Sequence, residues 1–277
     1  MYIAAQLKKI LIRFLPRDVN HFLRAKMSLV RIPNTQYASI SDLFPFRVND
    51  GWETHFELLN LPTLIDPLGQ HNISYKVRFV FFDEYGAFIY EWLTVGNGCV
   101  RRTLSINELL NGKSLSGYGT FACFHENYLP NLIIQRVFLA ERGYTGYLNK
   151  SISKVKGYVH GNLDALAMSD DHKFMCLGKS HYRSKEFRLQ HQLTGQATYE
   201  LGIVNTSDKA EIVTFELILD TKDIIKIKKT IPSKGIVWLA HKLNVNETAR
   251  VIIHSKLNLP RPVVFRIMEH SFDLFHG

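Results

Sequence analysis

Apolar and polar residues alternate in short runs from about residue 40 to the end of the chain, and polar turn residues separate the runs. Alternation with a period of two is typical of β-strands that bury one face. In residues 75–95, two such runs flank the turn sequence Asp83-Glu84-Tyr85-Gly86. Asp and Gly accept turn geometry, whereas Val, Phe and Ile favour strands. Because long helical patterns do not separate these runs, the sequence predicts an all-β fold.

This pattern occurs twice along the chain. Residues 213–231 repeat the order strand, turn, strand, with Asp220 in the position of Asp83 at an offset of 137 residues, and the same offset joins Gly98 to Gly235. Self-similarity at a fixed offset indicates an internal duplication. We therefore expect two tandem immunoglobulin-like antiparallel β-sandwich domains, a resemblance of architecture only. Further matches pair residues 46–48 with 187–189, 56–60 with 199–205, and 121–125 with 251–254.

The predicted organisation has four parts. A basic N-terminal arm spans residues 1–35, a first β-sandwich 36–140, an irregular connector 141–185 and a second β-sandwich 186–277. In the arm, apolar residues recur at helical spacing over residues 2–15, which predicts a short amphipathic helix. Glycines punctuate the connector, and irregular insertions in compact domains more often carry function than not. The connector is therefore the first place to seek a site.

The positive charge of the chain is concentrated in its N-terminal arm. The net charge is +9 over 277 residues, yet residues 1–33 hold seven Lys or Arg against Asp18 alone. A basic amphipathic helix can lie on an anionic membrane, so peripheral membrane contact through residues 1–26 is one expectation, and packing on the body is another. Met27 is an alternative start, which would leave those residues untranslated. The rest of the chain lacks the clustered basic charge of a nucleic-acid-binding surface.

The three cysteines, Cys99, Cys123 and Cys176, are scattered and odd in number, which indicates reduced structural thiols. Cys123 and Cys176 stand in apolar surroundings, where a thiol keeps a high pKa and stays inert. No run of apolar residues reaches the roughly 18 to 20 needed to cross a bilayer. We expect a cytoplasmic protein, with membrane association through the arm left open.

Histidine and aspartate stand close together near the end of each half: His160 with Asp164, and His270 with Asp273. Imidazole and carboxylate are ligands that suit zinc, iron, manganese or copper. Their spacing matches no compact zinc motif, however, and histidines often serve only to bond buried backbone groups. The candidate binding residues are His125, His160, Asn162, Asp164, His254, His270, Asp273 and His276.

The preferred functional interpretation is a non-enzymatic binding or interaction protein without a cofactor. The sequence contains no phosphate-binding loop, dinucleotide fingerprint, nucleophile elbow or metalloprotease helix. We expect a recognition surface between the two halves that takes a glycan or another protein. Five tyrosines are candidates for stacking on a sugar ring or a partner: Tyr118, Tyr128, Tyr144, Tyr147 and Tyr158.

The alternative interpretation is a metal-dependent enzyme with its site at the junction of the two halves. In this case His160, His270 and His276 bind a divalent transition metal, and Asp164 or Asp273 is the general base or a fourth ligand. Residues 158–166 and 268–277 must then lie close together. Histidines that share one ion must also approach within roughly 4 to 5 Å of one another, since metal–nitrogen distances are near 2 Å.

Overall fold

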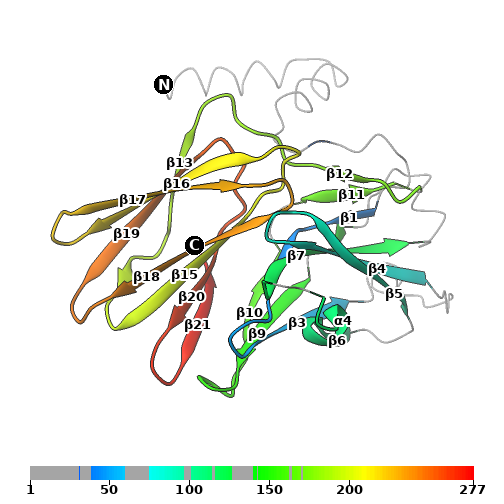
Figure 1. Cartoon of the computed structure of the whole chain (residues 1–277), viewed down its shortest axis with the longest axis horizontal. Coiled ribbons are helices and arrows are strands. Elements are labelled where there is room, and N and C mark those ends of the chain that lie inside the picture. Colours follow the sequence, from blue (N-terminus) through cyan, green and yellow to red (C-terminus); the bar gives the residue numbers. More distant parts are fainter. Residues whose placement is uncertain are drawn as a thin grey trace, which may run out of the picture.

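The computed structural model describes an all-β protein of several sheets, most of whose strand pairs are antiparallel (Figure 1). A single short helix stands among the strands of the described residues. The described residues are 31, 39–59, 75–96, 101–113, 116–126, 140–141, 143–161, 164–169 and 171–277. The predicted N-terminal helix and the membrane-contacting segment 1–26 lie outside this part of the chain.

Two sheets face each other to form the first sandwich. One contains, in spatial order, β2 (Phe44–Arg47), β7 (Tyr118–Glu126), β4 (Tyr75–Asp83) and β5 (Phe88–Gly96). The other contains β10 (Gly157–His160), β9 (Tyr144–Asn149), β3 (Trp52–Leu59) and β6 (Arg101–Ser105). Alternate residues of these strands fill a core rich in phenylalanine, including Phe46, Phe56, Phe79 and Phe121. The helix α4 (Ile106–Leu110) follows β6, and the Ser105 hydroxyl caps its first turn.

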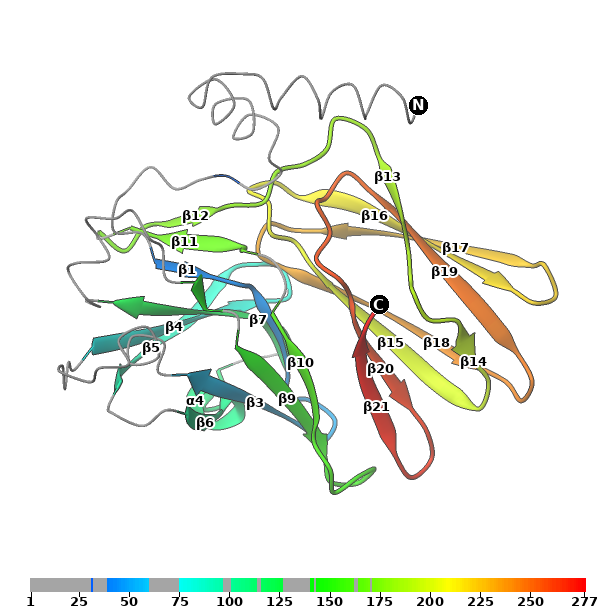
Figure 2. The same ribbon diagram turned by 180° about the vertical axis from the view of Figure 1, so that it is seen from behind.

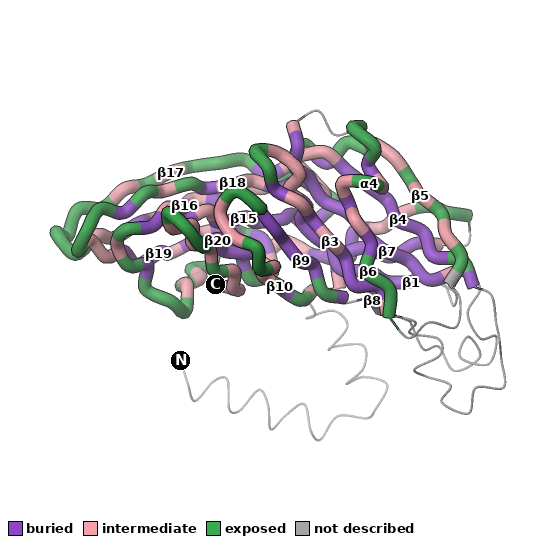
Figure 3. Tube along the Cα trace, turned by 90° about the horizontal axis from the view of Figure 1, so that it is seen from below, coloured by how far each residue is buried: buried purple, intermediate pink, exposed green. Residues whose placement is uncertain are grey.

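Two further sheets form the second sandwich. One contains β13 (Lys185–Arg188), β19 (Thr248–Ser255), β16 (Glu211–Leu219) and β17 (Ile224–Ile231), and β14 (Leu193–Thr194) also pairs with β19. The other contains β18 (Ile236–Leu243), β15 (Ala197–Val204), β20 (Val263–Ile267) and β21 (Phe272–His276). Leu201, Phe215 and Val264 are fully buried between them. Figure 3 shows buried residues running through the strands and exposed residues at hairpin tips.

A fifth, smaller sheet covers the outer face of β4 and β7, and we call it the cover sheet. It contains β12 (Phe174–Cys176), β11 (Leu166–Met168), β1 (Ser39–Ser41) and β8 (Ala140–Glu141). Its apolar residues pack on Val80, Phe82 and Phe124, which point away from the core of the first sandwich. The pairing of β1 with β8 is parallel. Both faces of β4 and β7 are thus buried, which explains their nearly continuous apolar sequence.

The two sandwiches share one strand order. Counted along the chain, the first, sixth, third and fourth strands of each form one sheet, and the eighth, seventh, second and fifth form the other. Two departures occur among the described residues: the additional short strand β14 in the second sandwich, and β8, which lies between β7 and β9 in the chain but belongs to the cover sheet. The last strands of the two sandwiches, β10 and β21, lie side by side (Figure 2).

An aromatic cluster, which we call the junction cluster, joins the two sandwiches. Phe265 of the second sandwich lies between two rings of the first, with ring centroids 5.0 Å from Trp52 and 4.9 Å from Tyr147. Trp238 packs on Phe265 from its own sandwich at 5.5 Å. The guanidinium of Arg47 lies 4.8 Å from the Trp52 ring centroid and pairs with Glu200 across the junction. Because aromatic contacts of this kind are dense and directional, the halves form one packed unit.

The segment predicted to be an irregular connector, residues 141–185, is more regular than expected. Its strands β9 and β10 complete the first sandwich, and β11 and β12 belong to the cover sheet. The glycines that suggested turns have other roles. Gly146, for example, lies in β9 beneath the ring of Tyr158, and a Cβ atom there would stand 2.5 Å from that ring. Glycine inside a strand can mark such a close approach rather than a loop.

Candidate functional site

Two of the predicted site residues, His160 and His276, lie in contact where the sandwiches meet. Each is the last residue of the last strand of its sandwich, β10 or β21. Their ring centroids are 5.1 Å apart, and Nε2 of His276 lies 2.7 Å from the carbonyl oxygen of His160. The structure therefore brings residues 158–161 close to the end of the chain.

These histidines line a cleft between the two sandwiches, which we call the junction cleft. Its volume is about 450 Å³ with its open mouth included. The first sandwich and the segment between β1 and β2 contribute one wall, and the second sandwich contributes the other. Ligand sites often occupy such concave surfaces between units. The polar residues of the lining are Asp42, Thr145, His160, Thr206, Arg261 and His276.

The other predicted site residues do not gather at this cleft. His254 lies on the outer face of β19, where its Nε2 is 3.3 Å from the carboxylate of Glu216. The His270 side chain is 88% exposed. Asp273 is exposed and stands 3.7 Å from Arg266. Asp164 lies on the segment that leads into β11, and Asn162 is outside the described residues.

His125 is separated from the cleft because its side chain points into the first sandwich. It is fully buried, and Nε2 lies 2.7 Å from Oε2 of Glu141. Within the described residues, potential ligand atoms of His, Cys, Asp and Glu gather in groups of three or more only at Cys123, His125 and Glu141. The set His160, His270 and His276 of the alternative interpretation therefore forms no metal-ligand cluster there.

The sheet face beside the junction cleft carries a second polar feature that the sequence did not single out. Glu57 of β3 is only 2% exposed. Its carboxylate accepts hydrogen bonds from Arg101 Nε at 2.7 Å, Thr103 Oγ1 at 2.8 Å and Tyr158 Oη at 3.2 Å. Burial raises the pKa of Glu57, but the hydrogen bonds from Arg101 and Thr103 more than offset this, so its pKa lies below the usual value. The group stays ionised at neutral pH.

Aromatic rings connect this carboxylate to the cleft. Tyr158 and Tyr144 are 41% and 48% exposed, and the Tyr144 ring lies 6.3 Å from that of His160. We call Glu57, Arg101, Tyr144, Tyr158 and His160 the aromatic face. The polar alternation Glu53, His55, Glu57 was the available signal for this solvent-facing side of β3. The two tyrosines fall in the segment expected to be an irregular connector, yet they stand on β9 and β10.

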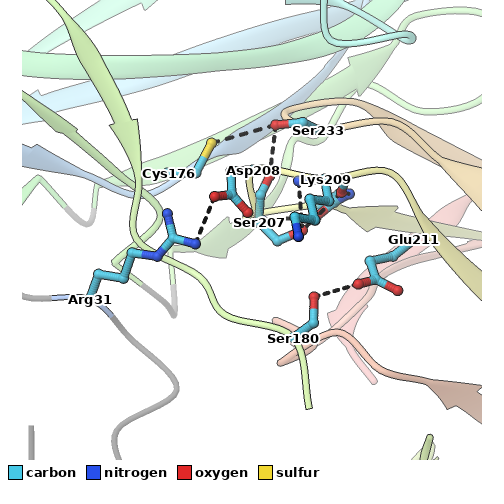
Figure 4. Close-up of polar contacts among 9 residues, drawn as sticks. Arg31, Cys176, Ser180, Ser207, Asp208, Lys209, Glu211 and Ser233 are labelled. Carbon is cyan, nitrogen blue, oxygen red and sulfur yellow. Dashed lines mark hydrogen bonds and ion pairs between the residues drawn. The ribbon is translucent and has the colours of Figure 1, made fainter. Parts of the chain in front are cut away.

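Arg31 of the N-terminal arm and the connector are both fastened to the second sandwich by polar contacts (Figure 4). Arg31 Nη2 donates a hydrogen bond to Asp208 Oδ2 at 2.7 Å. Cys176 Sγ lies 3.5 Å from Ser233 Oγ, which donates to the carbonyl oxygen of Ser207 at 2.7 Å. Burial raises the pKa of the Cys176 thiol, which agrees with the inert thiol that its apolar sequence surroundings predicted. These contacts hold Cys176 in a structural position.

We expect stability to fall as the pH drops below 6.5, the ordinary pKa of histidine, in part because of His276. Burial lowers the pKa of His276, the nearby His160 and Arg261 lower it further, and its bonds to the His160 and Pro262 carbonyl groups partly oppose this. The unfolded chain then binds protons that the folded chain excludes, so the stabilisation present above pH 6.5 is lost as the pH falls through the folded-state pKa. Urea denaturation at pH 7.5 and pH 5 measures this loss. The free energy of unfolding should fall less between these two pH values for His276→Asn than for the parent protein.

The matched control for this measurement is His270→Asn. His270 is 88% exposed, so its replacement should leave the pH dependence of the parent protein intact. Equal pH dependence in His276→Asn and the parent would contradict the assignment.

Comparison with known proteins adds no identity to this geometry. No family model matches the chain, and no curated protein matches it at a significant level. The junction cleft and the aromatic face are therefore the features from which a function is inferred.

Proposed function

We propose that this chain is a non-enzymatic binding protein that takes a glycan on the aromatic face, at the edge of the adjoining junction cleft. The observation that carries this proposal is the pair of exposed rings, Tyr144 and Tyr158, beside the buried and ionised Glu57. A sugar ring has apolar C–H faces, which pack on aromatic rings, and hydroxyl groups at its rim. Carboxylate and guanidinium groups supply the acceptors and donors that bind those hydroxyls.

The arrangement suits a glycan better than a protein surface. A protein interface depends on a large buried area with apolar anchors at its centre. Here the exposed rings are flanked by polar groups, and Glu57 is already held in place by Arg101 and Thr103. A binding group that is fixed in advance loses little entropy when the ligand arrives. The cleft next to His160 is narrow and holds little more than water, so a sugar ring would lie on the exposed rings at its edge.

An array of purified neutral and acidic oligosaccharides tests the proposal, followed by calorimetric titration of any glycan that binds. Tyr144→Ala and Tyr158→Ala should each weaken binding about tenfold, because loss of one stacking ring costs about 1.4 kcal/mol. Tyr182→Ala is the matched control, since Tyr182 is 91% exposed on the connector, outside the aromatic face.

Two results would contradict the proposal. One is the absence of binding to any oligosaccharide on the array. The other is binding that Tyr182→Ala weakens as much as Tyr158→Ala does. Binding of a protein that depends on Tyr144 and Tyr158 would assign the same face to a protein partner instead.

We also infer that the two sandwiches are immunoglobulin-like and arose by internal duplication. Their shared strand order supports this inference, as does the turn that follows the third strand in each. Gly86 and Lys222 occupy the same place in that turn, with φ of 77° and 71°. Superposition of β2–β10 on β13–β21 in an experimentally determined structure is the test, and unlike strand paths would contradict the inference.

Location in the cell is an expectation from the sequence alone. Within the described residues, no helix has the length and apolar character needed to cross a membrane. The basic segment 1–26 supports a cytoplasmic protein that touches an anionic membrane. Fractionation of cells that express the full chain tests this, and recovery outside the cytoplasmic and membrane fractions would contradict it.

A further inference from the structure

A group of three buried side chains in the first sandwich has no part in the proposed glycan site. Cys123 and His125 stand two residues apart on β7, so both point to the inner face of their sheet. Glu141 comes from β8 of the cover sheet. All three residues are fully buried, and one ligand atom from each lies within 4.8 Å of the other two.

A simple ion pair accounts for only part of this group. Nε2 of His125 and Oε2 of Glu141 are 2.7 Å apart. Nδ1 of His125 and Oε1 of Glu141 are also buried, however, and neither has a hydrogen-bond partner. Buried polar atoms are almost always bonded, and an exception often marks a bound ion or water. The thiol of Cys123 stands beside both of these side chains, and a thiol is only a weak hydrogen-bond donor.

The donor set matches a transition metal. Thiolate sulfur, imidazole nitrogen and carboxylate oxygen are the ligands that zinc binds most often, at about 2.3 Å for sulfur and about 2.0 to 2.2 Å for nitrogen and oxygen. Ligand atoms of a tetrahedral zinc ion are therefore roughly 3.2 to 3.8 Å apart. The three atoms here lie within 4.8 Å of one another, so small side-chain rotations bring them to that geometry.

Charge balance favours the same conclusion. The Cys123 thiol is fully buried beside the carboxylate of Glu141, and metal binding requires the thiol to lose its proton. A divalent ion displaces that proton to solvent and forms the metal–sulfur bond. One thiolate and one carboxylate then neutralise the two positive charges, which removes the cost of an unpaired charge in an apolar interior.

The backbone around the group is held by β1, which connects the two ligand-bearing strands. Ser41 Oγ accepts a hydrogen bond from the Cys123 amide at 2.8 Å, and Ser39 Oγ accepts one from the His125 amide at 3.1 Å. The amide of Asp42 donates to the carbonyl oxygen of Glu141 at 3.1 Å. Ligands on a backbone fixed in this way keep their relative positions, as a metal site requires.

We propose that Cys123, His125 and Glu141 bind one divalent transition-metal ion, preferentially zinc, inside the first sandwich. Three protein ligands leave one tetrahedral position, which a water molecule would occupy. Because the group is fully buried and lies apart from the aromatic face, the ion is structural: it ties β7 to β8. The proposal is independent of glycan binding.

The test uses the full chain, first purified without chelators and analysed for metals by mass spectrometry. The expected result is about one zinc per chain, with a melting temperature that falls when the ion is removed by a chelator and recovers when zinc is returned. Cobalt(II), added to the metal-free protein, is the spectroscopic probe. It should produce tetrahedral d–d absorption and a thiolate-to-cobalt charge-transfer band at one equivalent.

Variants and controls assign these signals to the three residues. Cys123→Ser should abolish the charge-transfer band and weaken cobalt binding at least tenfold. Cys176→Ser is the matched control, because Cys176 is also buried but contacts Ser233 rather than an imidazole or a carboxylate. Cys99→Ser controls for the remaining thiol, which lies outside the described residues.

One measurement does not depend on any variant folding. X-ray absorption spectra of the zinc-loaded parent protein should show one sulfur among otherwise nitrogen and oxygen ligands. The proposal is overturned if metal-free protein takes up no cobalt or zinc, or if the bound zinc has no sulfur ligand. In either case His125 and Glu141 form a buried ion pair alone.

Discussion

Phe265→Ala is expected to lower the free energy of unfolding by about 3 to 5 kcal/mol, the range for removing a buried phenylalanine side chain. Phe265 is fully buried in the junction cluster and contacts Trp52, Tyr147 and Trp238. Its loss leaves a cavity where the two sandwiches meet. Since three aromatic partners surround that cavity, they cannot all move in to fill it. The substitution should therefore loosen the junction as well as destabilise the fold.

Urea denaturation followed by circular dichroism measures the loss of stability. The fluorescence of Trp52 and Trp238 and the radius of gyration from solution scattering report on the junction. Val264→Ala is the matched control, because Val264 is adjacent in β20 but points into the core of the second sandwich. It should lower stability without changing the fluorescence or the scattering. Equal changes in both variants would show that the junction cluster does not hold the sandwiches together.

Asn205→Ala should cost about 3 kcal/mol or more, since it leaves several buried polar groups without partners at about 1 kcal/mol or more each. Asn205 is fully buried after β15. Its Nδ2 donates to the carbonyl oxygens of Lys209 at 2.7 Å and Ile231 at 2.9 Å. Its Oδ1 accepts from both the amide and the hydroxyl of Ser207, each at 2.8 Å. One side chain thus fixes the loop that contacts the connector.

Thermal and urea denaturation measure this effect. Gln192→Ala is the control, because its amide also makes a side-chain hydrogen bond, to Thr248 Oγ1 at 2.8 Å, but in an exposed position. Water replaces that bond, so the expected change is within about 0.5 kcal/mol. A comparable loss in both variants would mean that burial of the Asn205 network contributes little.

Local features were predictable from the sequence because they depend on neighbouring residues. The hairpin of β4 and β5 turns at residues 84–87, as Asp83 and Gly86 indicated. The helix α4 also follows local signals, because Ser105 caps its start and Asn111 ends it in the left-handed conformation. The all-β class was predictable for the same reason, because the alternation of apolar and polar residues involves only neighbouring positions. The structure confirms this class.

Relations between distant parts of the chain were harder to predict from the sequence. Part of the difficulty is a shift of one residue in the alignment of the two halves. The sequence aligned Asp83 with Asp220, but Leu219 makes the turn bond to Asp223 that Asp83 makes to Ala87. A slip of one residue moves each side chain to the opposite face of its strand. Val77 pairs with His125, while its counterpart Val213 pairs with Ser255. His125 therefore points inward, and His254 does not share its environment.

The candidate site was predictable only in part. The sequence singled out His160 and His276, and the structure places their rings in contact. The sequence pattern also matched His270 in the second half with His160 in the first. In the structure it is His276, and not His270, that ends β21, the strand that corresponds to β10. The aromatic face depends on β9 pairing with β3, across more than eighty residues of sequence, and on β10 pairing with β9. Such pairings leave no local signal.

The late position of β9 and β10 in the chain bears on synthesis. The first sandwich cannot close until His160 has left the ribosome, and its cover sheet waits for Cys176. Until then the growing polypeptide carries β3 with one unpaired edge, and β4 and β7 with one uncovered apolar face, a state prone to aggregation. The second sandwich is built from strands that follow one another without interruption. It can therefore assemble in a single stretch, against a partner that is already complete.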